Sequence, residues 1–357
     1  MSRFWSPAIQ SLVPYTPGEQ PKVADLTKLN TNENPYPPAP AVEKVLHRFP
    51  TDRLRLYPDP DASRLKQALA QQFGCNSSQV FVGNGSDEVL ALAFMAFFRQ
   101  SKPLLMPAIS YSFYDVYADL FAIEHRKIAL SDDFRIRLDD YPTDNGGIIF
   151  ANPNAPTSLA LSLEAIRTLL ERNTDSLVLV DEAYVDFGAQ SAASLIDQYP
   201  NLLVVQTFSK SRSLAGLRVG YALGHPALIE GLERVKNSFN SYPLDMVAID
   251  AACASLSDQD YFEATCQHII DTREQSASAL RSLGFKVLPS RTNFLFASHE
   301  QVPAQALMSY LRERNILVRH FNKPLIDNYL RITIGTDVEM DRLLRALRDH
   351  PQITASH

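Results

Sequence analysis

The stretch TFSKSRSLAGLRVG, residues 207–220, closes an apolar, β-branched run and then places Lys210 and Arg218 among small and apolar residues. Lys210 comes two residues after the run NLLVVQTF at 201–208. A lysine that is partly removed from water has a lowered pKa and can form a Schiff base with a carbonyl compound. The alternative is a surface lysine, which is the commoner meaning of a lysine just after a strand.

The composition indicates an ordinary globular protein. The chain has 357 residues, of which 45% are apolar and 21% charged, enough for one large domain and a smaller one. Its net charge of −6, without a basic stripe, argues against nucleic-acid binding. The N-terminal MSRFWSPAIQ lacks the apolar core of a signal peptide, and the apolar run at 89–98 is too short to span a bilayer. Three cysteines without a CxxC pair fit a reducing compartment. We therefore expect a cytoplasmic protein with no membrane partner and no metal.

Apolar, β-rich segments alternate with helical stretches through the first two thirds of the chain. The segments lie at 80–82, 103–106, 146–151, 176–182, 201–208 and 218–223. Helical patterns at 87–98 and 163–173 separate some of them. This alternation predicts an α/β fold, with a mostly parallel central sheet and helices on both of its faces.

The pattern changes near residue 245. Two helical stretches, 245–257 and 260–283, precede short strand-like segments around a helix near 303–314, and a last helix is expected at 337–348. We therefore expect a large domain over 46–244 and a smaller α+β domain over 245–357. The first 45 residues are rich in proline and predict an N-terminal arm that belongs with the small domain.

Three further motifs follow predicted strands. FVGNGSDE, at 81–88, offers backbone amides at a helix start, which suit a phosphate; the dinucleotide fingerprint GxGxxG fails because Glu88 replaces its third glycine. Asp181 ends a buried-looking strand, where a carboxylate is costly unless a cation pairs with it. NPNAPTS, at 152–158, supplies amide donors. Taken singly, these are also a turn capped by Ser86, a helix N-cap and a plain loop.

Together, the four motifs fit one ligand, pyridoxal 5′-phosphate, a phosphorylated aromatic cation that needs an amine. Their order resembles that of the fold-type-I pyridoxal-phosphate-dependent aminotransferases, in which S-x-S-K or a similar motif precedes the Schiff-base lysine. The similarity covers nearly the whole chain and is greatest to the histidinol-phosphate aminotransferase family. Besides GNGSDE and 207–220, it rests on VPYTPG (13–18), LNTNENPYPP (29–38), LYPDP (56–60), VDEAYVDF (180–187), ILVRHF (316–321) and YLRITIG (329–335).

The resemblance implies a homodimeric enzyme that moves an amino group between L-histidinol phosphate and 2-oxoglutarate in histidine biosynthesis. Lys210 would hold the cofactor and then move the substrate's Cα proton, and Asp181 would pair with the pyridine nitrogen. Tyr184 would donate to the phenolic oxygen and Tyr111 would stack on the ring. The phosphate would be held by the Ser86 and Asp87 amides, Ser209, Arg218 and Tyr57 of the partner chain. The substrate would be bound by Tyr15, Asn32, Arg319 and Arg331, with the arginines gripping its phosphate.

One loop departs from the family pattern N-P-x-N-P-T-G, whose second Asn bonds the phenolic oxygen. This chain has Ala155 at that place and Ser158 instead of Gly. Either Asn154 takes over the contact or Tyr184 makes it alone.

Other functions remain open on the sequence. Within the same fold, an aromatic amino-acid aminotransferase and a threonine-phosphate decarboxylase have similar sequences. A regulatory module that binds the cofactor without turnover is a third alternative. Such modules usually carry an appended DNA-binding domain; the 357 residues show no such extension at either end, so we expect an enzyme instead.

Overall fold

A seven-stranded sheet forms the centre of the larger part of the computed structural model, which describes residues 3–16, 18–23 and 25–353. In spatial order its strands are β2 (Val80–Asn84), β8 (Val219–Gly224), β7 (Leu202–Thr207), β6 (Val178–Asp181), β5 (Ile148–Ala151), β3 (Leu104–Pro107) and β4 (His125–Ile128). Only β8 runs antiparallel to its neighbours, so the predicted α/β fold with a mostly parallel sheet is confirmed. Strand β4, of sequence HRKI, was not predicted, because this polar edge strand lacks the apolar pattern of the others.

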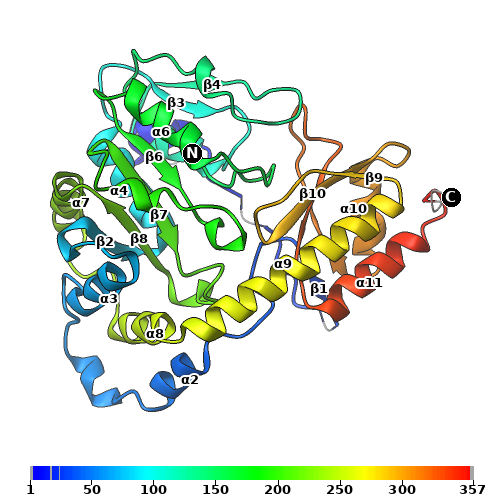
Figure 1. Cartoon of the computed structure of the whole chain (residues 1–357), viewed down its shortest axis with the longest axis horizontal. Coiled ribbons are helices and arrows are strands. Elements are labelled where there is room, and N and C mark those ends of the chain that lie inside the picture. The colour runs from blue at the N-terminus through cyan, green and yellow to red at the C-terminus, as the bar shows by residue number, and fades with distance from the viewer. Residues whose placement is uncertain (1–2, 17, 24, 354–357) are drawn as a thin grey trace.

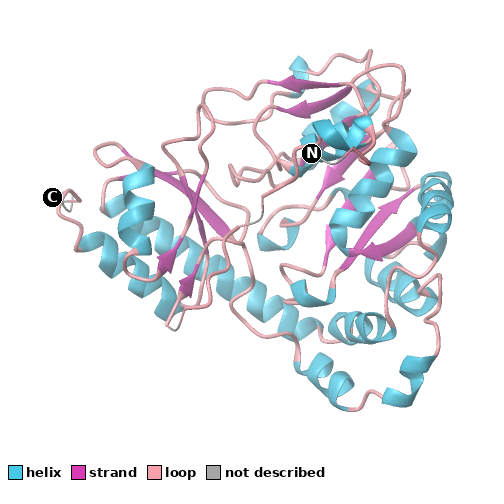
Figure 2. Cartoon of the chain, turned by 180° about the vertical axis from the view of Figure 1, so that it is seen from behind, coloured by secondary structure: helices cyan, strands magenta, loops and turns pink. Residues whose placement is uncertain are grey.

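Alternate residues of each strand pack against opposite helix layers, as the two-residue period of a strand requires. Val178 and Val180 of β6 belong to one apolar core, whereas Leu179 between them belongs to the other. The first core contains α3 (Ser63–Phe73), α6 (Leu163–Arg172) and α8 (Met246–Leu256), and the second contains α4 (Gly85–Phe97), α5 (Phe113–Leu120) and α7 (Pro226–Phe239). Both faces of the sheet are therefore covered, and Figures 1 and 2 show the helices on its two sides.

The smaller part is built on a four-stranded antiparallel sheet with the order β12-β13-β10-β9. Its strands are β9 (Phe285–Val287), β10 (Phe294–His299), β12 (Arg319–His320) and β13 (Leu330–Thr333), covered by α9 (Gln259–Ser282), α10 (Ala304–Arg312) and α11 (Asp337–Arg348). Among the described residues, no helix has both the length and the apolar character needed to cross a membrane.

The N-terminal arm contacts both parts. After the short helix α1 (Pro7–Ser11), strand β1 (Thr27–Lys28) pairs in parallel with β11 (Ile316–Leu317) of the small part. Helix α2 (Pro40–His47) instead buries Val42 in the core of the large part.

The packing of α8 bears on the domain boundary expected at 245. Ala248, Ile249 and Ala252 of this helix are buried in the same core as α3, on the large sheet. Helix α9 then runs from the large part to the small part, as Figure 1 shows. We therefore propose that the boundary lies between α8 and α9 rather than at 245, because a domain is defined by its own apolar core.

Arg273 of α9 is the largest fully buried side chain, with 1% of its surface exposed. Its Nη1 donates to the carbonyl of Phe187 at 2.7 Å and to that of Thr292 at 2.9 Å. These carbonyls belong to the segment after β6 and to the segment before β10, so one guanidinium ties the two sheets together.

We expect Arg273→Met to lower the free energy of unfolding by about 2–4 kcal/mol, because two buried carbonyls lose their donor. Urea denaturation followed by circular dichroism measures the change. Arg281→Met, on the exposed side of the same helix, is the matched control and should change stability by less than about 0.5 kcal/mol. Equal losses for both variants would show that Arg273 does not tie the sheets.

Candidate active site

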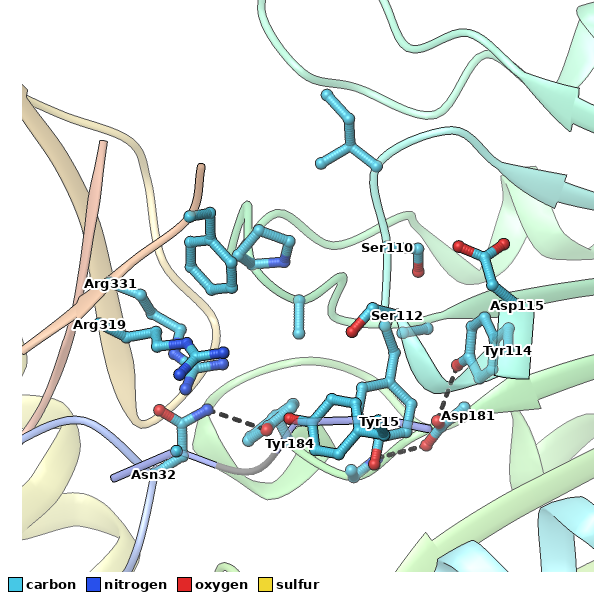
Figure 3. A pocket seen from close by; sticks show the side chains of 18 of the residues that line it. Tyr15, Asn32, Ser110, Ser112, Tyr114, Asp115, Asp181, Tyr184, Arg319 and Arg331 are labelled. Atoms are coloured by element: carbon cyan, nitrogen blue, oxygen red, sulfur yellow. Dashed lines mark hydrogen bonds between the residues drawn. The ribbon is translucent and has the colours of Figure 1, made fainter. Parts of the chain in front are cut away.

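A cavity of about 730 Å³ lies where one edge of the large sheet faces β12, β13 and the arm. Asp181 ends β6 and Lys210 follows β7, so both reach this edge from strands that run in one direction. Of the residues predicted for the site, all except Tyr57 and Asn154 line the cavity. Figure 3 shows Arg319 and Arg331 at one end and Asp181 at the other, with Tyr15 and Tyr184 between them.

Lys210 reaches into the cavity from the loop after β7. Its Nζ lies 3.4 Å from the carbonyl oxygen of Thr31, and no described residue forms an ion pair with it. Burial, and secondly the positive charge of Arg331, lower the pKa of Lys210 to about 8. About a tenth of this amine is therefore unprotonated at pH 7, far more than of an ordinary lysine, and the unprotonated amine is the form that attacks a carbonyl carbon.

Asp181 is buried at the end of the cavity away from Arg319 and Arg331, with 4% of its surface exposed. The Tyr114 hydroxyl donates to its Oδ2 at 2.7 Å, and the Ala183 amide donates to its Oδ1 at 3.3 Å. Burial raises the pKa of Asp181 to about 6 against these hydrogen bonds, and no cation among the described residues pairs with it. A protonated ring nitrogen beside this carboxylate would offset the cost of its burial, so this end of the cavity fits a pyridinium.

The start of α4 forms an anion site between Gly85 and Arg218. Gly85 has φ +81°, and a Cβ there would lie 2.5 Å from Arg218 Nη2, so only glycine lets the guanidinium approach. Gly220 likewise lets its backbone pack against that of Ser86, because a Cβ added at Gly220 would lie 2.2 Å from the Ser86 amide nitrogen. The amides of Ser86 and Asp87 belong to the first helical turn, where they have no acceptor within the helix. These donors and the helix dipole suit a phosphate.

Arg218 reaches this site from the start of a strand. It directly precedes β8, and it shares the edge with Lys210 because β8 runs antiparallel to β7. Its Nη2 lies 3.0 Å from Asp87 Oδ2, and the Tyr111 hydroxyl donates to Asp87 Oδ1 at 3.1 Å. Ser209 lines the same cavity as Arg218, and its hydroxyl oxygen accepts a hydrogen bond from the Thr207 hydroxyl.

The far end of the cavity carries two guanidinium groups. Arg331, in β13, donates from Nη2 to the carbonyl of Asn30 at 2.8 Å, whereas its Nε has no partner among the described residues. Burial lowers the pKa of Arg331, and the neighbouring charge of Arg319 acts in the same direction. Tyr15 of the arm lines this cavity, with its ring 4.9 Å from that of Phe113. An anion with two negative charges would complement this end.

Three predicted site residues lie elsewhere or have other partners. Asn154 Nδ2 donates to the Ile109 carbonyl and to Thr157 Oγ1, and Asn154 Oδ1 accepts from the Ser110 hydroxyl. The side chain therefore joins the segments after β3 and β5 instead of lining the cavity. Tyr57 is 80% exposed and stacks on Tyr242, away from the cavity of its own chain. Asn32 lines the cavity, but its Nδ2 donates to the Tyr184 hydroxyl at 2.9 Å.

Two supporting contacts were missed from the sequence. Tyr114 holds Asp181, and the signal that could have found it is its spacing of three from Tyr111, which puts both rings on one side of a helical turn. Asn34 donates to the carbonyl of Lys210 at 2.9 Å, and this contact has no local sequence signal because 176 residues separate the two.

Comparison with known proteins places this arrangement in a family. The family model for class I and II aminotransferases matches residues 24–347. A histidinol-phosphate aminotransferase of Chromohalobacter salexigens is 62% identical over 97% of this chain and 99% of its own length, and one of Hydrogenovibrio crunogenus is 58% identical over 98% of each. The crystal structure of histidinol-phosphate aminotransferase from Sinorhizobium meliloti, in complex with pyridoxal 5′-phosphate, superposes with a TM-score of 0.87 at 25% identity over 97% of both chains. The chain belongs to the histidinol-phosphate aminotransferase family of class I and II aminotransferases.

Proposed function

We propose that this protein is a pyridoxal-phosphate-dependent transaminase that exchanges the amino group of L-histidinol phosphate with 2-oxoglutarate, giving imidazole acetol phosphate and glutamate. The reaction is a step of L-histidine biosynthesis. The observation that carries this proposal is one cavity with a partly neutral lysine, a buried carboxylate without a cation, and a positively charged group at each end. Each end has a separate ligand in the proposal: the cofactor phosphate lies at Arg218, and the substrate phosphate lies at Arg331 and Arg319.

The residues around Lys210 fit the cofactor and its chemistry. Bound pyridoxal phosphate supplies an electron-withdrawing ring that accepts the electron pair released at the substrate Cα. Asp181 would keep the ring nitrogen protonated, and the Tyr111 ring would cover one face of the cofactor. Lys210 Nζ would hold the cofactor, and the same amine would take up the proton that leaves the substrate Cα.

The two arginines at the far end support a phosphorylated substrate. A guanidinium can grip a phosphate with two parallel hydrogen bonds, and the unpartnered Nε of Arg331 is one available donor. Arg319 adds a second positive charge, which favours a dianion over the single carboxylate of an aromatic amino acid. This pair favours histidinol phosphate over an aromatic amino acid. Threonine phosphate also has a phosphate, so its decarboxylation is distinguished by the substrate assay below.

An exposed apolar patch supports a homodimer in which each chain completes the other's site. The patch contains Tyr57, which stacks on Tyr242 at 4.8 Å, together with exposed Leu54, Leu56 and Phe239. Neighbouring apolar side chains that are exposed together often mark a protein interface. In such a dimer, Tyr57, which does not line the cavity of its own chain, would reach the cofactor phosphate of the partner. The cytoplasmic location stays a prediction.

The purified protein should be yellow, and borohydride should fix the cofactor to Lys210, as peptide mapping would show. In the apoprotein, labelling of Lys210 by a small neutral aldehyde should rise with pH around a midpoint of about 8, because only the unprotonated amine attacks. Arg331→Met should move that midpoint upward, since it removes a charge that lowers the pKa of Lys210. Lys210→Ala should reduce turnover by roughly 10²–10⁴ or more. A label on Lys236 or Lys323 instead would contradict the assignment.

Arg331→Ala should cost about 2–5 kcal/mol in kcat/KM for histidinol phosphate, because the substrate dianion loses its partner. The same amine without its phosphate should react slowly with the wild type and change far less on mutation. Arg345→Ala, on the exposed face of α11, is the control and should leave both values unchanged. Equal losses with both amines would make Arg331 structural. Faster turnover of phenylalanine or tyrosine would favour an aromatic aminotransferase, and release of CO₂ from threonine phosphate would favour the decarboxylase.

Mixing inactive Tyr57→Phe and Lys210→Ala chains should restore activity above the sum of the two parents. Each hybrid dimer would contain one site with an intact Lys210 and an intact Tyr57 from the partner. Subunit exchange under mild denaturant, followed by assay and sedimentation, measures this. An active monomer, or no recovery in proven hybrids, would contradict the shared site.

A further inference from the structure

Asn32 is held in a fixed position by residues of the small sheet. It is 1% exposed and has φ 56°, in the left-handed region that asparagine tolerates better than most residues. Its amide N–H donates to Thr333 Oγ1 at 3.0 Å, and its carbonyl accepts from Asn293 Nδ2 at 3.0 Å. Such a backbone conformation persists where its surroundings determine it, and here two neighbouring side chains do so.

The Thr333 hydroxyl also determines which way the Asn32 amide points. It accepts the backbone N–H of Asn32 and donates its only hydrogen to Asn32 Oδ1 at 3.0 Å. With the amide turned over, this hydroxyl would meet two donors, and its hydrogen would have no acceptor among the residues that the structure describes. Nδ2 therefore faces Tyr184 and donates to its hydroxyl oxygen, as the dashed line in Figure 3 shows.

This direction of donation leaves the Tyr184 hydrogen free. An amide N–H cannot accept, so the Tyr184 oxygen is the acceptor, and no residue in the described part of the chain takes the hydroxyl hydrogen. Tyr184 lines the cavity, whereas β5 and the loop after it line the cavity only with Ala151, Ala155 and Pro156. None of these three side chains can donate a hydrogen bond to a ligand, so the Tyr184 hydroxyl is the donor available beside them.

We propose that Asn32 is a positioning residue that orients Tyr184 as the hydrogen-bond donor to the phenolic oxygen of the bound cofactor. This role replaces the substrate contact expected for Asn32 from the sequence, and it lets Tyr184 make alone the contact that Ala155 cannot make. The inference rests on the proposed function, because it concerns the cofactor. Since Thr333 fixes the Asn32 amide, the orientation of Tyr184 depends on how the arm and the small sheet are docked.

Several charged groups act on Tyr184, so a test must separate charge from orientation. Arg331 of β13 and Lys210 after β7 place positive charge near it, and Asp181 of β6 and Asp87 of α4 contribute negative charge. Among these neighbours only Asn32 is hydrogen-bonded to the hydroxyl. Replacing Asn32 by Asp keeps the shape but reverses the bond, because a carboxylate accepts the Tyr184 hydrogen and withdraws it from the cofactor.

The measurement is the pH titration of the absorbance of the cofactor bound to Lys210. A donor to the phenolic oxygen stabilises its negative charge and so weakens the hold on the proton shared with the lysine nitrogen, which lowers the titration midpoint. Asn32→Asp should therefore raise the midpoint by about one pH unit or more, the scale of one hydrogen bond to a charged group. Thr333→Val, which frees the amide to turn, should shift it in the same direction by less.

Two controls separate the reversed bond from added charge. Asn30→Asp places a carboxylate two residues away, on the same cavity, without a bond to Tyr184. In a Tyr184→Phe background, the shift caused by Asn32→Asp should fall to the shift of Asn30→Asp. If Asn32→Asp does not fold, as judged by circular dichroism, the Thr333→Val titration decides.

The proposal is overturned if Asn32→Asp leaves the midpoint in place, or if its full shift persists without the Tyr184 hydroxyl. It is equally overturned if Asn32→Asp raises only KM for histidinol phosphate and leaves the spectrum unchanged, because that result assigns Asn32 to the substrate. A wild-type protein that binds no cofactor at all would instead refute the proposed function.

Discussion

The cost of enclosing charged groups in one cavity without ion-pair partners governs this structure. Among the described residues, Lys210, Asp181 and Arg331 form no ion pair, although they share the cavity. Removal from water disfavours the charged form of each, which lowers the pKa of Lys210 to about 8 and raises that of Asp181 to about 6. The same shifts make the lysine reactive and the carboxylate ready for a cation. The protein without a ligand therefore bears a desolvation cost, which a ligand with complementary charges would reduce.

Burial of apolar side chains on the large sheet stabilises the fold and offsets this desolvation cost. Apolar side chains on both faces of its strands are buried in two cores, and the polar residues Asp181 and Lys210 line the cavity from the ends of β6 and β7. The loop that bears Lys210 is anchored directly after the lysine, where Ser211 bonds Asp186 and Arg212 donates to the carbonyl of Ser255. The Arg212 guanidinium also lies 3.9 Å from the centre of the Phe262 ring at the start of α9. A rigid support of this kind holds a reactive side chain in place.

The N-terminal arm connects the two sheets at the reacting centre. Within four residues it provides the Thr31 carbonyl near Lys210 Nζ, the Asn32 amide on Tyr184 and the Asn34 amide on the Lys210 carbonyl. The same segment is joined to the small sheet through Thr333. Any change in the docking of the small sheet would therefore reach the lysine and the tyrosine together. With the substrate at Arg331, as proposed, this arrangement would link substrate binding to the geometry around the cofactor.

The class of fold and two residues at the centre of the cavity, Lys210 and Asp181, could be predicted from local patterns in the sequence. The spacing of apolar runs gave the order of strands and helices, because burial of one face or of both leaves a periodic signal. Lys210, Asp181 and the glycine-bearing turn could be found because each directly follows a strand, and parallel strands bring such positions to one edge.

The side chains that support these groups could not be predicted from local patterns, because they come together only in the folded chain. The antiparallel direction of β8 puts Arg218 on the same edge, and strand direction leaves no local signal in the sequence. The role of Asn32 depends on Thr333, which lies 301 residues away, and the contact of Asn34 with Lys210 spans 176 residues. Asn154 had the right chemistry for a cofactor contact, but Ile109 and Ser110, in the segment after β3, bind both ends of its amide. Local patterns record burial and turns, whereas hydrogen-bond partners distant in sequence are fixed only when the chain packs.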